Sequence, residues 1–95
     1  MGKEAIIEKY LKTQAVKNDF LCYKFVSPSN DGVPDRILIG NGLTFFVELK
    51  APGEKPRKLQ ERVFAKMQKH GAIVYVIDSK EGVDKLFEEI LWTVQ

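Results

Sequence analysis

The chain has 95 residues, of which 44% are hydrophobic and 29% are charged, and its formal net charge is +2 at pH 7. This length and composition predict one small globular domain spanning residues 1–95 and exclude intrinsic disorder. One cysteine excludes an internal disulfide and a cysteine-rich zinc site, and no apolar run reaches the roughly 18 residues of a membrane helix. Because the N-terminus also lacks signal-peptide features, we expect a cytoplasmic protein.

In chain order, the N-terminal half predicts a helix, a strand, a loop and two further strands, at residues 3–14, 20–26, 27–34, 35–39 and 43–50. Apolar residues such as Ile7 and Leu11 recur at helical spacing in the first segment. The loop "SPSNDGVP" is dense in turn-forming residues. Asn41-Gly42 is the strongest short hairpin signal, so it predicts that the last two strands pair across a two-residue turn.

The C-terminal half predicts a helix, a strand and a last helix, at residues 56–69, at residues 72–77 and from Ser79 onward. Leu59, Val63 and Met67 form the apolar stripe of the first of these helices, with Phe64 beside it. The run "AIVYVI" is continuously apolar and predicts a strand covered on both faces. A helical crossover places this strand parallel to its predecessor. The predicted fold is α/β in the order α-β-β-β-α-β-α, a small mixed sheet flanked by helices.

Charge is unevenly distributed along the second half. Residues 50–70 hold seven Lys or Arg against two Glu, whereas residues 78–89 hold five acidic residues against two Lys. A basic block beside an acidic one suits a surface that meets a polyanion on one side. Two solvated helix faces would give the same pattern.

The predicted hairpin brings two carboxylates together. A two-residue turn at Asn41-Gly42 pairs residues whose numbers add to 83, which places Asp35 opposite Glu48. Opposed residues have Cβ atoms about 5 Å apart on one face of the sheet, so the two charges repel unless a cation lies between them. Lys50 projects from the same face. A bulge or a longer turn would shift this register by one residue and separate the two acids.

Two acids and a lysine at one end of a sheet suit phosphodiester hydrolysis. Mg²⁺ binds one or two carboxylates and takes its remaining ligands from water and phosphate. It lowers the pKa of bound water and neutralises charge on the phosphate oxygens. Lys50 can orient the attacking water or stabilise the transition state. An exposed ion-pair cluster without catalytic function is the alternative interpretation.

The segment "GVPDR…FVELKAPGEKPRKLQ" resembles the VRR-NUC (virus-type replication-repair nuclease) branch of the PD-(D/E)xK nuclease superfamily. The resemblance implies a restriction-endonuclease-like core with Mg²⁺ or Mn²⁺ bound by Asp35, Glu48 and the backbone carbonyl of Leu49. It also implies that Lys50 is the catalytic lysine and that Gln60 lies near the metal waters or the scissile phosphate.

The same resemblance implies a glutamate on the first helix, for which Glu4 is the candidate and Glu8 the alternative. Lys24, Ser27 and Ser29 precede Asp35, while Lys55, Arg57 and Lys58 follow the active strand, and all six are candidate contacts to DNA phosphates.

Family members that consist of the nuclease domain alone resemble Holliday junction resolvases. This likeness implies branched DNA as the substrate, a homodimer and a phage or mobile-element source. The alternatives are a non-catalytic nucleic-acid-binding module, a nuclease that acts on flap or linear DNA, and a structural dimerisation domain.

Overall fold

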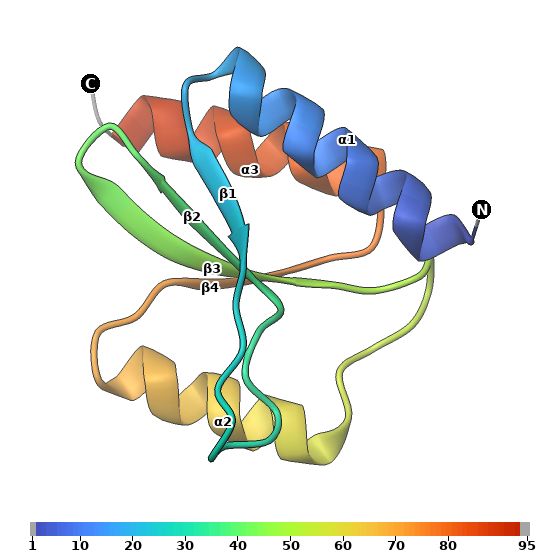
Figure 1. The fold of residues 1–95 in the computed structure, drawn as a ribbon, viewed down its shortest axis with the longest axis vertical. Coiled ribbons are helices and arrows are strands. Elements are labelled where there is room, and N and C mark those ends of the chain that lie inside the picture. The colour runs from blue at the N-terminus through green and yellow to red at the C-terminus, as the bar shows by residue number, and fades with distance from the viewer. Residues whose placement is uncertain (1, 94–95) are drawn as a thin grey trace.

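The structure is a computed structural model that describes residues 2–93. Seven elements follow one another in the expected order (Figure 1). They are α1 (Lys3–Lys17), β1 (Leu21–Lys24), β2 (Arg36–Gly40), β3 (Leu43–Leu49), α2 (Lys58–Lys69), β4 (Val74–Ile77) and α3 (Lys80–Thr93). None of the helices in residues 2–93 is long and apolar enough to cross a membrane.

The four strands form one sheet in the order β1-β2-β3-β4. Strand β2 is antiparallel to both β1 and β3, and β4 is parallel to β3. Helix α2 is the crossover between β3 and β4, so the predicted parallel connection is confirmed.

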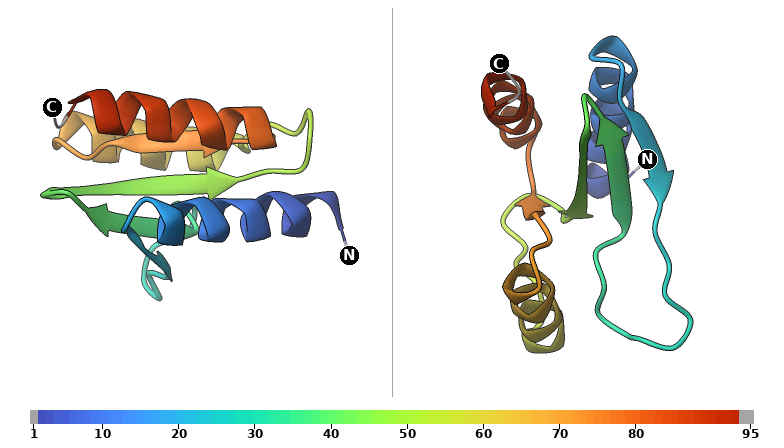
Figure 2. Two further views of the ribbon diagram at one scale, coloured as in Figure 1. Left: turned by 90° about the horizontal axis from the view of Figure 1, so that it is seen from above. Right: turned by 90° about the vertical axis from the view of Figure 1, so that its left-hand side faces the viewer.

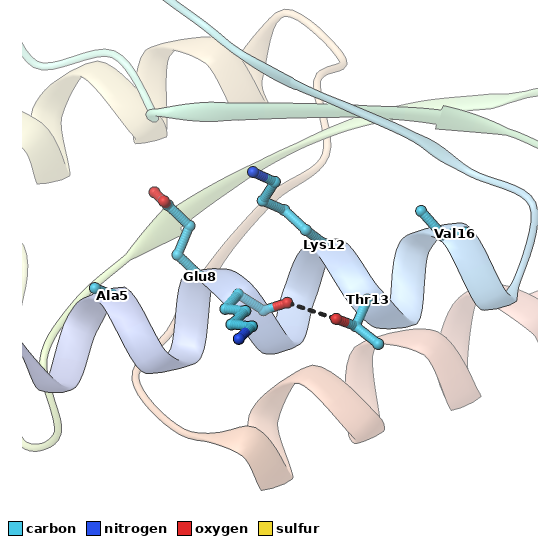
Figure 3. Close-up of a pocket in the computed structure, with 6 residues that line it drawn as sticks. Ala5, Glu8, Lys12, Thr13 and Val16 are labelled. Carbon is cyan, nitrogen blue, oxygen red and sulfur yellow. Dashed lines mark hydrogen bonds between the residues drawn. The ribbon is translucent and has the colours of Figure 1, made fainter. Parts of the chain in front are cut away.

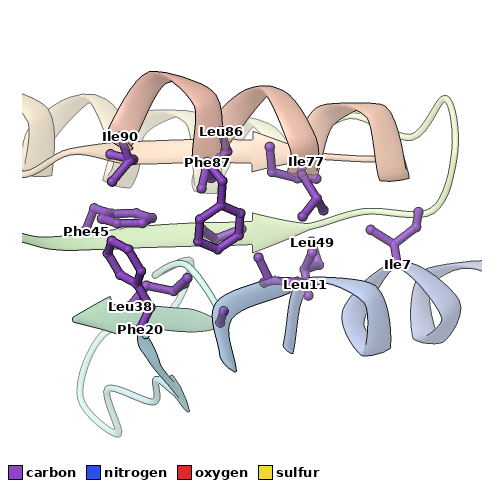
Figure 4. Packing of buried hydrophobic residues seen from close by; sticks show 13 residues of the cluster. Ile7, Leu11, Phe20, Leu38, Phe45, Leu49, Ile77, Leu86, Phe87 and Ile90 are labelled. Atoms are coloured by element: carbon purple, nitrogen blue, oxygen red, sulfur yellow. The ribbon is translucent and has the colours of Figure 1, made fainter. Parts of the chain in front are cut away.

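Helices α1 and α3 cover one face of the sheet and α2 covers the other (Figure 2). The main core lies between the sheet and the α1–α3 layer (Figure 4). Its fully buried members include Leu11 of α1, Leu38 of β2, Phe45 and Val47 of β3 and Leu86 of α3. The hydroxyl of Tyr10 donates to Asp84 Oδ1 at 2.7 Å and thereby links α1 to α3.

Several predicted boundaries differ from the observed ones. Helix α1 continues to Lys17 because Ala15 extends the buried row begun by Ile7 and Leu11. Helix α2 begins at Lys58, two residues after Pro56, because Arg57 is still extended, with φ −67° and ψ 160°. Strand β1 is shorter than predicted and ends at Lys24.

The prediction that the last strand is covered on both faces is wrong. Strand β4 contains only Val74–Ile77 and lies at the edge of the sheet. Val76 is 43% exposed on the face where α2 packs, so the contacts of α2 and α3 with β4 leave this edge strand only partly covered. A continuous apolar run of strand length can therefore also form an edge strand that is only partly covered.

The apolar stripe predicted for α2 is also only partly buried. Phe64 and Gln60 are the buried residues of this helix and face the sheet. Leu59 is 38% exposed, and Val63 and Met67 are half-buried. The helix is therefore rotated so that its stripe flanks the loop between β1 and β2 instead of filling a core.

Candidate active site

The turn between β2 and β3 sets the register of the hairpin. Asn41 and Gly42 have φ values of 49° and 77°, the left-handed conformations that a two-residue type I′ turn requires. The observed pairs run from Gly40–Leu43 to Arg36–Val47, so their residue numbers add to 83 as predicted. The next position of this register places Asp35 opposite Glu48.

The alternation of side chains along β3 separates core residues from site residues. Phe45, Val47 and Leu49 are buried in the α1–α3 layer. Glu48 and Lys50 lie on the opposite face, where α2 packs. Asp35 shares this face because it pairs with Glu48.

Glu48 is held by a network that spans the sheet and α2. Its Oε2 accepts a hydrogen bond from Gln60 Nε2 at 3.0 Å and lies 3.1 Å from Lys50 Nζ. Lys50 Nζ also donates to Gln60 Oε1 at 3.0 Å. The same Oε1 accepts from the backbone N–H of Arg57 at 2.9 Å, which fixes the amide at the first turn of α2. Three of the predicted site residues are therefore in direct contact.

Asp35 faces this network from the end of β2. Its Oδ1 accepts a hydrogen bond from the backbone N–H of Leu49 at 3.2 Å. Burial and, secondly, the charge of Glu48 raise the pKa of Asp35 from 3.8 to about 6, despite the opposing effect of that hydrogen bond. The carboxyl of Asp35 therefore lies in a partly buried position close to the charge of Glu48.

The backbone of Leu49 is available at the same place because of Pro34. If the register is continued by two positions beyond the last observed pair, Arg36–Val47, Leu49 lies opposite Pro34, which has no N–H to donate. The N–H and carbonyl of one strand residue point to the same side, and that of Leu49 is the side where Asp35 lies. The Leu49 carbonyl therefore receives no hydrogen bond from Pro34 and is oriented toward the two acids.

The two glutamates of α1 occupy different environments. Glu8 Oε2 lies 2.8 Å from the guanidinium of the buried Arg36, and this hydrogen bond is the main reason that the pKa of Glu8 is lowered. Figure 3 shows Glu8 on the same side of α1 as Lys12, whose charge also lowers this pKa. Glu4, in contrast, is exposed, and its charge contributes to the raised pKa of Asp35.

The donor set fits a divalent cation with mixed protein and water ligands. Two carboxylates and one carbonyl converge, and the contacts to Glu48 leave its Oε1 without a hydrogen-bonding partner among residues 2–93. The described residues contain no cluster of three His, Cys, Asp or Glu side chains. Mg²⁺ commonly binds one or two carboxylates and retains waters, so this set suits it better than a site closed by protein ligands.

The candidate phosphate contacts lie on two parts of the surface. Lys24 is exposed at the end of β1, and the hydroxyl of Ser27 accepts from Asn30 Nδ2 at 2.9 Å. Lys55, Arg57 and Lys58 are exposed on the loop that follows Lys50 and at the start of α2. The first group therefore lies on β1 and the β1–β2 loop, and the second lies at the start of α2 and on the loop before it. Ser29, the remaining candidate, is exposed on that loop.

Sequence reasoning missed the residue that holds the loop after Lys50. Asp78 Oδ2 accepts from the backbone N–H of Gly53 at 3.1 Å, although the two residues are 25 positions apart. Gly53 has a φ of 82°, a left-handed conformation that favours glycine. No sequence pattern connects this loop with the end of β4.

Comparisons with known proteins agree with this geometry. A solved structure described as "VRR_NUC domain" has a TM-score of 0.85 and 33% identity, and the match covers 93% of this chain and 97% of that chain. "Putative nuclease p44" of Acyrthosiphon pisum secondary endosymbiont phage 1 is 46% identical over 80 residues, which are 83% of this chain and 86% of the relative. No family model matches the chain. The resemblance drawn from "GVPDR…FVELK" and the expected fold are confirmed.

Proposed function

The chain belongs to the VRR-NUC nuclease domain family, and we propose that it is a metal-dependent endonuclease that hydrolyses phosphodiester bonds in DNA. One observation carries this proposal. The hairpin register places Asp35 opposite Glu48, next to the hydrogen bond between Lys50 and Gln60. We infer that its substrate is branched DNA, such as a four-way (Holliday) junction, and that it acts as a homodimer.

In this proposal Asp35, Glu48 and the Leu49 carbonyl hold Mg²⁺ or Mn²⁺, and Glu4 adds a water-mediated or direct contact. The cation supplies a more acidic bound water and neutralises charge that develops on the phosphate. The raised pKa of Asp35, caused first by burial and secondly by the charge of Glu48, supports the assignment, because a bound cation would stabilise the ionised form against both effects.

The other two residues act from the side of α2. The Lys50 ammonium, held between Glu48 and Gln60, orients the attacking water or stabilises negative charge as the phosphorus becomes five-coordinate. Gln60 keeps the lysine and the glutamate in place and lies near the scissile phosphate. Both roles depend on the position of α2 against the sheet.

DNA is held chiefly by contacts to its backbone. Lys55, Arg57 and Lys58 follow the active strand, and Lys24 and Ser27 lie on the segment that leads to Asp35. These contacts are independent of sequence, so the choice of target depends on DNA shape and on the assembly. Two active sites related by a twofold axis would cut two strands of a junction symmetrically.

We further propose that residues 1–95 act as one nuclease domain in the cytoplasm of a host cell, as part of a phage-encoded protein. The phage origin of the 46% identical relative supports this setting.

The test is cleavage of labelled four-way, flap and plain duplex DNA in Mg²⁺ and Mn²⁺. The double variant Asp35→Ala, Glu48→Ala should lose at least about 10²-fold in rate. The control variant Glu54→Ala, Glu61→Ala removes two exposed acids from the neighbouring segment and should retain the rate. Undiminished cleavage by the Asp35, Glu48 variant would exclude the proposed site.

The substrate series and the oligomeric state distinguish the alternatives. Preference for the flap or the linear duplex would replace the junction as the substrate. Binding that persists in a chelator, with no cleavage in either metal, would indicate a non-catalytic binding module. Sedimentation of the free protein as a monomer at the concentrations used for cleavage would exclude the homodimer.

A further inference from the structure

A groove lies beside α2, and none of the residues that line it belongs to the proposed catalytic set. It has a volume of ≈ 660 Å³ and runs between α2 and the loop that joins β1 to β2. Figure 1 shows that loop lying along α2. We call it the α2 groove. The lining residues that matter here are Phe25 and Val33 on the loop side, and Leu59, Val63, Lys66 and Met67 on the helix.

The groove is a built feature of the fold. Gly32 has a φ of 87°, and a Cβ at this position would lie 3.1 Å from Val63 and 3.3 Å from Leu59. The loop therefore packs directly on α2, and the positive φ together with these close approaches favours glycine at this position. Phe25 is held by an edge-to-face contact with Phe46, with ring centroids 5.1 Å apart. Both walls are thus positioned by packing.

Its chemistry combines an apolar floor with cations. Helix α2 carries four Lys or Arg side chains against Glu61, a net charge of +3 over Lys58–Lys69. One of these cations, Lys66, lines the groove directly, and the acidic Asp31 of the loop also lines it. Apolar and aromatic side chains beside cations suit a nucleotide, whose base has an apolar face and whose phosphate is an anion.

Two lining residues of the groove are neighbours of site residues in the chain. Val33 lies two residues before Asp35, and Leu59 is adjacent to Gln60. A DNA strand at Lys50 would therefore pass the mouth of the groove. A base within a duplex is stacked and paired, so only an unpaired base is free to enter.

We propose that the α2 groove binds an unpaired base of the DNA substrate, next to the phosphate that is cut. This inference rests on the proposed function and narrows its substrate to DNA with at least one unpaired nucleotide at the branch. Four-way junctions with fully paired arms would then be bound through a base that opens at the crossover.

The experiment measures binding in a chelator, so that no strand is cut. The probe is a duplex with a short single-stranded arm, in which the unpaired nucleotides are replaced one at a time by an abasic residue. At one position near the branch the missing base should weaken binding to the wild-type protein about tenfold.

Two variants of α2 test whether the weaker binding of the abasic probe is due to the groove. Met67→Glu places a charge on the apolar floor, and Ala65→Glu places the same charge on an exposed position of the same helix. Met67→Glu should reduce the effect of the missing base to less than about twofold, whereas Ala65→Glu should retain it. If Met67→Glu unfolds, Leu59→Glu replaces it as the variant that places a charge in the groove. Leu59 lies in the first turn of α2, where an acidic residue favours the helix.

Two results would overturn the proposal. The first is a wild-type protein that binds every abasic probe as tightly as the intact one. The second is a base dependence that survives in Met67→Glu and Leu59→Glu. A change of sedimentation in Met67→Glu, with base dependence intact, would assign the groove to a second copy of the chain. Cleavage of the same intact probe in Mg²⁺ tests the proposed function separately, so the two failures are distinguishable.

Discussion

The side-chain amide of Gln60 joins Glu48 to the start of α2. Its Nε2 donates to Glu48 Oε2 at 3.0 Å, while its Oε1 accepts from the Arg57 backbone and from Lys50. One buried amide thus satisfies a carboxylate, an ammonium and a helix N-terminus. The helix, the sheet and the candidate catalytic lysine therefore depend on one another.

Gln60→Ala should lower the free energy of unfolding by about 1–3 kcal/mol, because it leaves a buried carboxylate and a backbone N–H without this partner. Urea denaturation measures the loss. The control Gln68→Ala lies on an exposed position of the same helix and should change stability by less than about 0.5 kcal/mol. Equal effects of the two variants would contradict the structural role of Gln60.

Asp35→Asn should stabilise the metal-free protein above pH 6. The pKa of Asp35 is about 6 in the folded protein and 3.8 is its ordinary value, so the folded state binds this proton more tightly. The stability that protonation contributes is complete below pH 3.8 and is lost as pH rises through 6. Asn stays neutral and can still accept from Leu49.

We expect the gain at pH 7 to be about 1–2 kcal/mol, discounted because Asp35 is partly exposed, and to vanish near pH 3.5. Unfolding in a chelator at both pH values measures it. A gain that is the same at both pH values would show that the carboxylate charge is not its cause. Mg²⁺ should reverse the order of stability at pH 7, because it binds only the carboxylate form.

Glu4→Ala should weaken metal binding without changing stability, and Glu8→Ala should lower stability without changing metal binding. Glu8→Ala leaves the guanidinium of Arg36 unpaired and should cost about 1–3 kcal/mol of stability, with little change in metal affinity. Glu4→Ala should leave stability within about 0.5 kcal/mol and weaken Mn²⁺ binding. Calorimetric titration with Mn²⁺, paired with denaturation, measures both. Weaker metal binding in Glu8→Ala alone would make Glu8 the first-helix acid.

The triple variant Lys55→Gln, Arg57→Gln, Lys58→Gln should reduce the salt dependence of DNA binding. Each lost phosphate contact lowers the slope of log K against log salt by about 0.9, so the change should approach three. Fluorescence anisotropy over a salt series measures it. The control Lys85→Gln changes an exposed cation in the acidic segment of α3 and should leave the slope unchanged.

The sequence predicts the hairpin well because its determinants are local. Asn41-Gly42 fixes the turn and the turn fixes the register, so the opposition of Asp35 and Glu48 follows from a few adjacent residues. The order of elements follows similarly from periodicity and turn residues. The contact of Lys50 with Gln60 needs the tertiary position of α2, which no local pattern gives.

The sequence predicts less well which side chains become buried when a helix packs on the sheet. Leu59 and Met67 look like core residues in a helical stripe, but α2 turns Gln60 and Phe64 to the sheet instead. A buried glutamine cannot be recognised by hydrophobic periodicity, since its burial depends on partners that come from β3. The ion pair of Glu8 with Arg36 likewise joins segments that are far apart in the sequence.

Pro34 has a consequence for how the ribbon ends. Any other residue at this position would carry an N–H facing Leu49 and would allow β2 and β3 to form one more rung of the ladder. This additional pair would use a lone pair of the Leu49 carbonyl for a hydrogen bond. It would also bring β2 and β3 closer together beside Asp35 and Glu48. Pro34 thus ends the backbone hydrogen bonding between β2 and β3, and the candidate active site lies at the end of the hairpin where this hydrogen bonding stops.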